Sequence, residues 1–485
     1  MASIEEIREA RLKKISILEG NGMSPYPSVS KRDTDLKDLA LNFSKLQKEE
    51  VDPTIAGRLL SLRAQGKIMF ANIYDGTGEF QVVIEKNELG DRDFSLFKET
   101  VDLGDILEFK GYLFETKRGT PSVKAQEWSM LSKSLRPLPE KWHGLQNVEE
   151  RYRRRYLDIL MNRELKDLFE KKSLFFKVMK DFLEERGFME VHTPSLEVTT
   201  GGAEACPFKT HHNDSGMDLF LRISVGELWQ KRLMAAGFNR TYEMGRVYRN
   251  EGTGSEHLHE FTNMELYASY FDFEKGKKMV KDLYLHLAQE VFGKTAFSTR
   301  GHSFDLADEW QDLDYVETVK EMTGIDILEE SSENIKKKLE ELEVSFEGET
   351  RERLIDSLWK YCRKQISGPA FLVNHPKIVA PLSRLNDNDK RLTNTFQVII
   401  AGSELGRAHA ELNDPVDQAS RFEEQRKLIE AGDEEAMMPD QEYVEMLEYG
   451  MPPTFGFGVG ERLFAFMADR SIREVTLFPL MKNKS

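Results

Sequence analysis

The sequence predicts an α+β protein in which a small N-terminal β-barrel of the OB-fold type precedes a larger domain of mixed strands and helices. Three observations favour this fold class. Residues 55–130 alternate or run apolar in five short stretches, which glycine-containing turns separate. From residue 160 to residue 187 the apolar residues instead recur at helical spacing. The 485 residues of the chain are enough for two or three domains.

Composition narrows the class of protein. Hydrophobic residues make up 40% of the chain and charged residues 31%, which is typical of a soluble globular protein. Apolar runs such as residues 396–402 are far too short to span a bilayer. The N-terminal residues carry acids from the start and have no apolar core, unlike a signal peptide. Cys206 and Cys362 permit one disulfide but indicate neither a disulfide framework nor a cysteine zinc site. We therefore expect a cytoplasmic protein with no membrane association.

The net charge of −16 argues against a protein coated in nucleic-acid-binding charge. Local basic patches are still possible, because individual lysines and arginines make the contacts to phosphates. The densest basic cluster is RYRRRY at residues 151–156. It fits both a solvated helix start and a phosphate-binding patch.

The N-terminal part of the chain divides into two segments. Residues 1–50 are predicted to be a helical extension, and residues 51–131 the barrel. An OB-fold barrel often binds single-stranded nucleic acid through aromatic side chains on an exposed sheet face. Phe70 and Phe80 are candidates for such platforms, although a phenylalanine in a strand more often belongs to the core. The pattern supports the barrel and leaves its ligand open.

The rest of the chain starts with a predicted linker, residues 132–150, which has two prolines and no clear period. The second domain, residues 151–485, then begins with a helix that Gly187 ends and a strand that Pro194 interrupts. Between residues 312 and 365 the pattern is helical and highly charged, which indicates a solvated helical insert.

One stretch, VYRNEGTGSEHLHEFTNMELY at residues 247–267, is dense in groups that bind ligands. A strand, a loop and a returning strand would bring these groups to one surface. Each alone could be an exposed charge or a core ring, so the density indicates the site. The groups are Arg249, Glu251, His257, Glu260, Phe261 and Glu265.

Two further stretches have the same character. Residues 452–467 are a glycine-rich strand that enters an amphipathic helix, where Arg462 could meet phosphate oxygens as a fork. Residues 396–415 read as strand, turn and strand. They carry Glu404 and Glu411, carboxylates that could bind Mg²⁺ or a cationic substrate. Each acid alone reads as a surface residue.

Together these stretches resemble motifs 2 and 3 of the class II aminoacyl-tRNA synthetases, and residues 174–197 resemble motif 1. The subgroup is that of the lysyl, aspartyl and asparaginyl enzymes. It implies an N-terminal OB-fold for the anticodon and a catalytic domain built on an antiparallel sheet flanked by helices. The resemblance runs from about residue 50 to the end. Segments specifically similar to lysyl-tRNA synthetases are residues 135–144, 151–162, 201–213 and 410–425.

The resemblance implies that lysine and ATP form lysyl-adenylate, and that the lysyl group then passes to the 3′ end of tRNA(Lys). No enzyme nucleophile is needed, because catalysis is positioning and charge stabilisation around the α-phosphate. Arg249 would hold the α-phosphate and Arg462 the γ-phosphate, and Glu404 would ligate the Mg²⁺ cofactor. These three are the expected catalytic residues. The other expected ATP-binding residues are Glu251, His257 and Phe261.

For the amino acid, the resemblance implies a pocket of carboxylates. An ammonium taken into a closed pocket needs carboxylate and hydrogen-bond partners to offset its desolvation. Glu411 and Tyr267 would meet the side-chain ammonium, and Glu227 the α-amino group. The full set of expected lysine-binding residues is Gly202, Glu227, Glu265, Tyr267, Arg407 and Glu411.

The resemblance also implies macromolecular partners. In the barrel, Phe70, Gln81 and Glu127 match the positions that stack on and read a uridine-rich anticodon, which suits recognition of unpaired bases. A homodimer is implied because motif 1 forms the subunit interface in this class.

The chain departs from the family pattern in three places. Gln397 stands where a second metal-binding glutamate is usual, and a neutral amide is a poorer Mg²⁺ ligand, so the number of metal ions is open. Arg407 stands where an asparagine usually faces the bound lysine. It could clamp the substrate carboxylate or point away. The segment before Glu227 has one residue more than usual, and motif 3 has one fewer.

Three rival functions would leave different marks on the sequence. An aspartyl or asparaginyl enzyme would offer basic groups to the substrate side chain, which only Arg407 favours. A non-catalytic relative would lack Arg249, Glu404 or Arg462. A relative that lysylates a protein would lack the barrel. The residues present favour the lysyl enzyme over all three.

Overall fold

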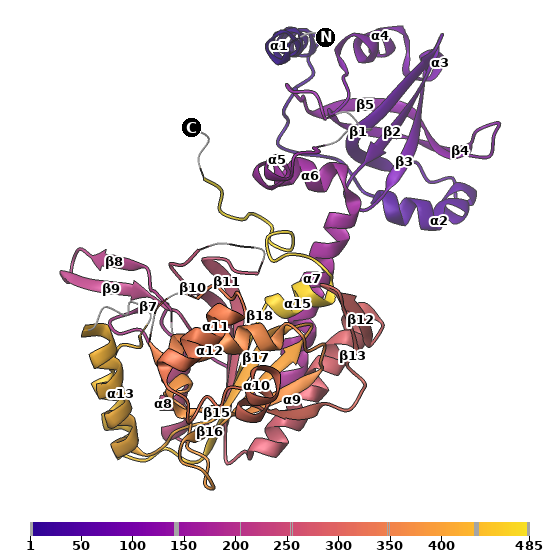
Figure 1. The fold of residues 1–485 in the computed structure, drawn as a ribbon. Coiled ribbons are helices and arrows are strands. Elements are labelled where there is room, and N and C mark those ends of the chain that lie inside the picture. Colours follow the sequence, from indigo (N-terminus) through magenta and orange to yellow (C-terminus); the bar gives the residue numbers. More distant parts are fainter. Residues whose placement is uncertain are drawn as a thin grey trace. The chain divides into compact units, whose positions relative to one another are not determined.

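The computed structural model (Figure 1) describes residues 3–139, 145–203, 205–252, 254, 256–346, 348, 350–430 and 436–482. Part of the predicted linker, residues 140–144, lies outside this set. By contacts, the chain divides into two compact units, Met1–Met161 and Asn162–Ser485. Within the described residues, no helix is both long and apolar enough to cross a membrane. Cys206 and Cys362 are free thiols.

The first unit is built around a closed five-stranded barrel with strand order β1-β2-β3-β5-β4, as the sequence predicts. Helices α1 and α2 precede it, and its apolar side chains form one core with residues of both helices. The elements are α1 (Ile4–Gly20), α2 (Leu36–Lys48), β1 (Thr54–Gln65), β2 (Ile68–Tyr74), β3 (Glu79–Glu85), α3 (Lys86–Leu89), α4 (Asp91–Thr100), β4 (Ile106–Glu115), β5 (Pro121–Ser132), α5 (Val148–Arg153) and α6 (Arg155–Met161).

Strand alternation and one glycine shape this barrel. Along β2, buried residues alternate with half-buried ones, so one face of the strand fills the core. Strand β4 is irregular against β5 at Gly111, where a Cβ would lie 1.8 Å from the carbonyl oxygen of Lys124. No side chain fits at that position. The basic cluster of residues 151–156 forms helical ion pairs, such as Arg153 with Glu149 at 2.6 Å. The solvated-helix interpretation is only partly right, because Arg155 is 1% exposed and pairs with the buried Asp158.

The second unit is built on an eight-stranded sheet with order β14-β15-β16-β17-β18-β11-β10-β6. Its neighbouring strands are antiparallel except at the β14–β15 and β10–β6 pairs. The antiparallel sheet flanked by helices confirms the predicted fold class. The sheet strands are β6 (Met189–Glu190), β10 (Arg240–Tyr248), β11 (Glu260–Ser269), β14 (Gln311–Asp314), β15 (Ala370–Pro376), β16 (Leu392–Ile400), β17 (Ser403–Ala410) and β18 (Thr454–Gly460).

Helices and two small sheets complete this unit. Helix α7 buries Phe175, Met179 and Phe182 in the main core, and Gly187 at φ +78° follows its end, as predicted. The helical elements are α7 (Arg163–Glu184), α8 (Glu227–Ala235), α9 (Phe273–Leu287), η1 (Ala288–Phe292), α10 (Tyr315–Thr323), α11 (Ser332–Glu341), α12 (Arg351–Arg363), η2 (Lys377–Val379), α13 (Pro415–Glu430), α14 (Gln441–Glu448) and α15 (Arg462–Met467). The small sheets are β7 (Leu196–Glu197), β9 (Met217–Leu221) and β8 (Lys209–His212), and β12 (Ala296–Thr299) with β13 (His302–Asp305).

The predicted insert contains three helices, α10, α11 and α12, with a hydrophobic core of their own. Helix α11 buries only Ile335 and Leu339, in agreement with a solvated helix. Helix α12 differs, because it buries six residues, among them Trp359. The same core includes Leu372 of β15 and Ile399 of β16, so the insert packs against the sheet.

Candidate active site

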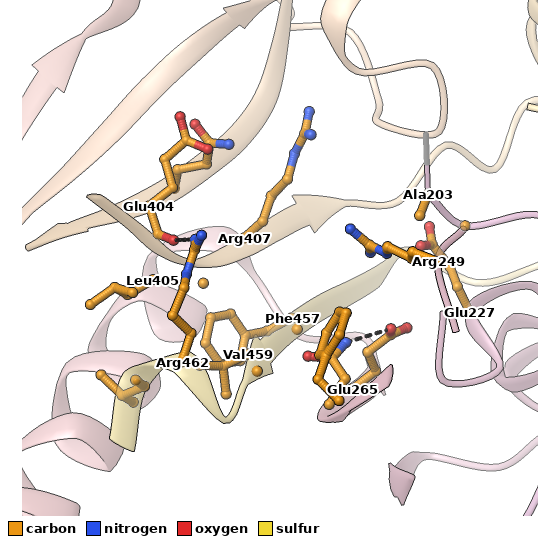
Figure 2. Close-up of a pocket in the computed structure, with 18 of the residues that line it drawn as sticks. Ala203, Glu227, Arg249, Glu265, Glu404, Leu405, Arg407, Phe457, Val459 and Arg462 are labelled. Carbon is orange, nitrogen blue, oxygen red and sulfur yellow. Dashed lines mark hydrogen bonds between the residues drawn. The ribbon is translucent and has the colours of Figure 1, made fainter. Parts of the chain in front are cut away.

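A cavity of about 450 Å³ lies over the strands β11, β16, β17 and β18 (Figure 2). Every residue predicted to bind ATP, lysine or metal lines it. The sheet explains this convergence, because these residues stand on adjacent strands or on the loops that leave them. They are Gly202, Glu227, Arg249, Glu251, His257, Phe261, Glu265, Tyr267, Gln397, Glu404, Arg407, Glu411 and Arg462.

The hairpin β10–β11 supplies one wall of the cavity, as the strand, loop and returning strand of the sequence predict. Arg249 follows β10, and its backbone N–H donates to the carbonyl of His259 at 2.8 Å. Its guanidinium donates to the Ile223 carbonyl at 3.4 Å and lies 5.4 Å from the ring centroid of Phe261. The hairpin therefore presents a cation beside an aromatic face. Residues 253 and 255 of its loop lie outside the described set.

One end of the cavity is acidic. The Glu265 carboxylate accepts from the backbone N–H of Val225 at 2.8 Å and from the Asn263 amide at 2.9 Å. The Tyr267 hydroxyl donates to its other oxygen at 3.3 Å. Burial first, and the Glu227 charge next, raise the pKa of Glu265 to about 7. Three hydrogen-bond donors thus hold the Glu265 carboxylate in a buried position, where its ionised form is destabilised.

A lysine of the protein itself holds two further carboxylates of this end. The Lys231 ammonium, fully buried on α8, lies 2.7 Å from Glu227 Oε1 and 2.6 Å from Glu411 Oε2. Burial lowers the pKa of Lys231, but the two carboxylates outweigh it and raise the pKa overall. Burial raises the pKa of Glu411 to about 8, against the attraction of Lys231. One buried cation therefore pairs with two of the three carboxylates at this end.

Two glycines make room for this acidic end. A Cβ on Gly456 would lie 2.0 Å from Glu411 Oε1. A Cβ on Gly202, whose φ is +88°, would lie 2.6 Å from Glu227 Cβ. Both positions therefore depend on the absence of a side chain.

The other end of the cavity is basic. Arg462 donates to the backbone carbonyl of Glu404, as Figure 2 shows. Two cations from the end of helix α12, Lys360 and Arg363, line the same end. Desolvation lowers the pKa of His257, and the charge of Arg462 lowers it further, although solvent still reaches the ring. His257 is therefore a neutral imidazole among cations at neutral pH.

The predicted metal ligands lie at this basic end. Glu404 Oε1 accepts a hydrogen bond of 2.6 Å from the indole N–H of Trp359. The Gln397 amide oxygen lies 3.0 Å from Nε2 of the buried His375. Within the described residues, no group of three or more His, Cys, Asp or Glu is arranged to hold a metal. The donors present fit one Mg²⁺ held by Glu404 and completed by substrate oxygens, which is how Mg²⁺ commonly binds.

Arg407 does not face the acidic end. Its guanidinium donates to the backbone carbonyl of Val379. Figure 2 shows it directed away from Glu265. Arg407 still lines the cavity, and its contact with the substrate carboxylate stays a prediction.

Sequence reasoning missed three groups of this cavity. Lys231 is four residues after Glu227 on a helix, a spacing that could have identified the pair. Lys360 and Arg363 lie in the insert, where no sequence signal connects them to the motifs.

The residues predicted to read an anticodon lie in the barrel of the first unit. Phe70 and Gln81 are half-buried on the adjacent strands β2 and β3. Phe70 pairs with Val83, and Gln81 is two residues before Val83, so Phe70 and Gln81 are diagonal neighbours. Glu127 is exposed on β5 and pairs with Lys110 of β4, away from the β3 pairing. Phe80 is a core residue, 6% exposed, rather than a stacking platform.

Comparison with known proteins gives a consistent result. Residues 147–482 match the family model of class II tRNA synthetases (D, K and N), and residues 54–131 match that of the OB-fold nucleic acid binding domain. A lysine–tRNA ligase of Thermotoga maritima is 41% identical to this chain, across 99% of this chain and 97% of that protein. Lysine–tRNA ligases of Halalkalibacterium halodurans and of Roseiflexus sp. are each 40% identical across 99% of this chain, covering 98% and 99% of their own lengths.

Proposed function

The chain belongs to the class II tRNA synthetases (D, K and N), and we propose that it joins lysine to tRNA at the expense of ATP, as its relatives' names describe. The observation that carries this proposal is the acidic end of the cavity. Lys231 pairs with two of the three buried carboxylates, Glu227 and Glu411, and Glu265 has no cation of the protein within ion-pair distance among the described residues, so a second ammonium has a place to bind. Aspartate or asparagine would bring only its α-ammonium to that end, and no side-chain cation.

Lysine binding follows from this charge arrangement. A buried ammonium is stable only when carboxylates and hydrogen-bond acceptors replace its water. We assign Glu411 and Tyr267 to the side-chain ammonium, and Glu227 with the backbone of Gly202 to the α-amino group. Glu265, which Val225 and Asn263 hold in place, completes the negative wall.

ATP binding follows from the aromatic and cationic groups. The ring of Phe261 offers a face for adenine, with Glu251 near its exocyclic amine. Arg249 would hold the α-phosphate, and Arg462 with His257 the outer phosphates. The lysine carboxylate then attacks the α-phosphorus and pyrophosphate leaves. The residues position the reactants and offset the charge that develops, and they form no covalent bond themselves.

The cofactor assigned to this site is Mg²⁺, held by Glu404 with phosphate oxygens. When bound, it would supply positive charge to the phosphate oxygens. Gln397 is a neutral amide already in contact with His375, so it adds little to the metal site. We expect one tightly bound ion rather than several.

Further parts of the proposal concern the whole protein. The barrel would bind the anticodon of tRNA(Lys) through Phe70, Gln81 and Glu127. A homodimer would form through the motif 1 region, residues 174–197, where Leu174, Met189 and Leu196 are exposed apolar residues. We place the enzyme in the cytoplasm.

The experiment that tests the proposal is ATP–pyrophosphate exchange with each standard amino acid in turn. We expect lysine alone to support exchange. An Arg407→Asn variant run alongside should keep that specificity, because Arg407 points away from the acidic end. Exchange with aspartate or asparagine and none with lysine would disprove the substrate assignment.

A further inference from the structure

The last turn of helix α12 brings positive charge to the basic end of the cavity. Lys360 and Arg363 are three residues apart, a spacing that places two side chains on one helix face. Both line the cavity that also holds Arg462, His257 and Glu404. This helix belongs to the insert, to which neither the sequence motifs nor the proposed function gives a part in the reaction.

The Arg363 side chain has unused hydrogen-bonding capacity. One terminal nitrogen donates to the carbonyl of Gly402 at 3.2 Å. Its Nε is buried, and among the described residues no acceptor lies within hydrogen-bond distance of it. The nearest carboxylate oxygen, Glu404 Oε1, is 3.9 Å away and already accepts from Trp359. A buried guanidinium N–H without an acceptor is unfavourable, and an anionic ligand in the cavity would supply one.

Lys360 differs in its surroundings. Its side chain is 55% exposed and its ammonium pairs with Asp356 at 2.6 Å. It is therefore an exposed point charge at the mouth of this end, whereas Arg363 is a buried fork. Among the described residues lining this end, the cations Lys360, Arg363 and Arg462 outnumber the carboxylates Glu256 and Glu404. Asp356 offsets part of the charge of Lys360, and the end keeps a net positive charge.

We propose that Arg363 and Lys360 bind the outer phosphates of ATP and the pyrophosphate that leaves, so that the insert helix forms part of the nucleotide site. This inference rests on the proposed function and deepens it. The pair would supply from the protein part of the charge that additional metal ions would otherwise supply. Trp359, four residues before Arg363 on the same helix, donates to the Glu404 carboxylate, so the last turns of α12 carry both the partner of the metal ligand and the phosphate-binding cations.

The test uses the full-length protein and two readouts. The first is calorimetric binding of inorganic pyrophosphate in EDTA, which needs neither amino acid nor metal. The second is the set of KM values for ATP, pyrophosphate and lysine in exchange assays. Arg363→Gln should weaken pyrophosphate binding and raise the KM for ATP and pyrophosphate about tenfold, the size of one charge-assisted hydrogen bond. Lys360→Gln should weaken pyrophosphate binding and raise the same KM values about threefold, as expected for an exposed charge.

Two control variants distinguish a loss of phosphate binding from a general effect of substitution. Arg363→Lys should recover part of the pyrophosphate affinity. Lys337→Gln on α11, whose side chain is 63% exposed, should behave like the wild type. The KM for lysine should be unchanged in all of them. If Arg363→Gln leaves pyrophosphate affinity intact, or raises the KM for lysine as much as that for ATP, the inference is wrong. If the wild type shows no lysine-dependent exchange, the proposed function is wrong. The pyrophosphate-binding assay in EDTA would still test whether Arg363 and Lys360 bind pyrophosphate.

Discussion

At the scale of single residues, the site is organised by a charge imbalance. Lys231 balances at most part of the charge on Glu227, Glu265 and Glu411. The remaining repulsion and the burial raise the pKa values of Glu265 and Glu411. A substrate ammonium would relieve this state, so under the proposed function part of the affinity for lysine would come from the unfavourable charge arrangement of these carboxylates.

Glu411→Gln should abolish most lysine binding. The change removes one carboxylate from a buried ionic network and leaves Lys231 paired with Glu227 alone, so the substrate ammonium meets a less negative wall. Truncating one partner of a buried charge pair commonly costs 2–5 kcal/mol, so the KM for lysine should rise about 100-fold or more. The KM for ATP should change little. Exchange kinetics measure both, with the exposed Glu445→Gln as the control. Equal effects on both substrates would contradict the assignment.

Lysine binding should depend on pH in a defined direction. In the free protein the pKa is about 7 for Glu265 and about 8 for Glu411. Each carboxyl group is therefore mostly protonated when the pH is below its pKa. The bound ammonium favours the ionised forms, so binding releases protons and affinity rises with pH from 6 to about 8. The rise should stop as the substrate ammonium approaches its own pKa of about 10.4. Calorimetry in two buffers of different ionisation enthalpy measures the release. Proton uptake at pH 6.5 would contradict the pKa directions.

At the scale of elements, the sequence predicted the hairpin β10–β11, the strand pair β16–β17 and the glycine-rich strand β18. The local sequence pattern is enough to predict these three elements, because the alternation of apolar residues and the turn residues lie within each stretch. That these elements meet at one cavity was predicted from the family resemblance and not from the local pattern. The role of α12 could not be predicted, because it depends on packing of Trp359 and its neighbours against β15 and β16. Such tertiary contacts leave no periodic signal.

The strand β18 shows how an element can set specificity through what it lacks. A Cβ at Gly456 would lie 2.0 Å from Glu411 Oε1 and 2.7 Å from Tyr267, so Gly456→Ala must displace the two groups assigned to the lysine ammonium. We expect the KM for lysine to rise at least tenfold, with a loss of stability of about 1–3 kcal/mol from overpacking. Gly460→Ala on the same strand is the control, because its Cβ would meet nothing closer than 3.4 Å. If both variants kept wild-type KM values, the assigned pocket would be in the wrong place.

At the scale of the whole molecule, the proposed function assigns one task to each unit. Each unit has its own hydrophobic core, and the described residues that line the cavity all belong to the unit Asn162–Ser485. The sequence predicted two domains from the change of period between the barrel and the helix that follows it, but it placed residues 151–161 in the second domain, whereas by contacts they belong to the first unit. Amino-acid activation should therefore be insensitive to changes on the barrel surface.

Phe70→Ala tests this separation. Phe70 is half-buried on β2, so its ring has an open face for a base, and loss of one base–aromatic stack costs about 1–3 kcal/mol. The KM for tRNA(Lys) in aminoacylation should therefore rise about tenfold, while lysine-dependent ATP–pyrophosphate exchange stays at the wild-type rate. Leu41→Ala removes an apolar side chain that is 73% exposed on α2 and should affect neither reaction. A fall in exchange would mean that the barrel contributes to activation. Unchanged aminoacylation would instead remove Phe70 from the anticodon site.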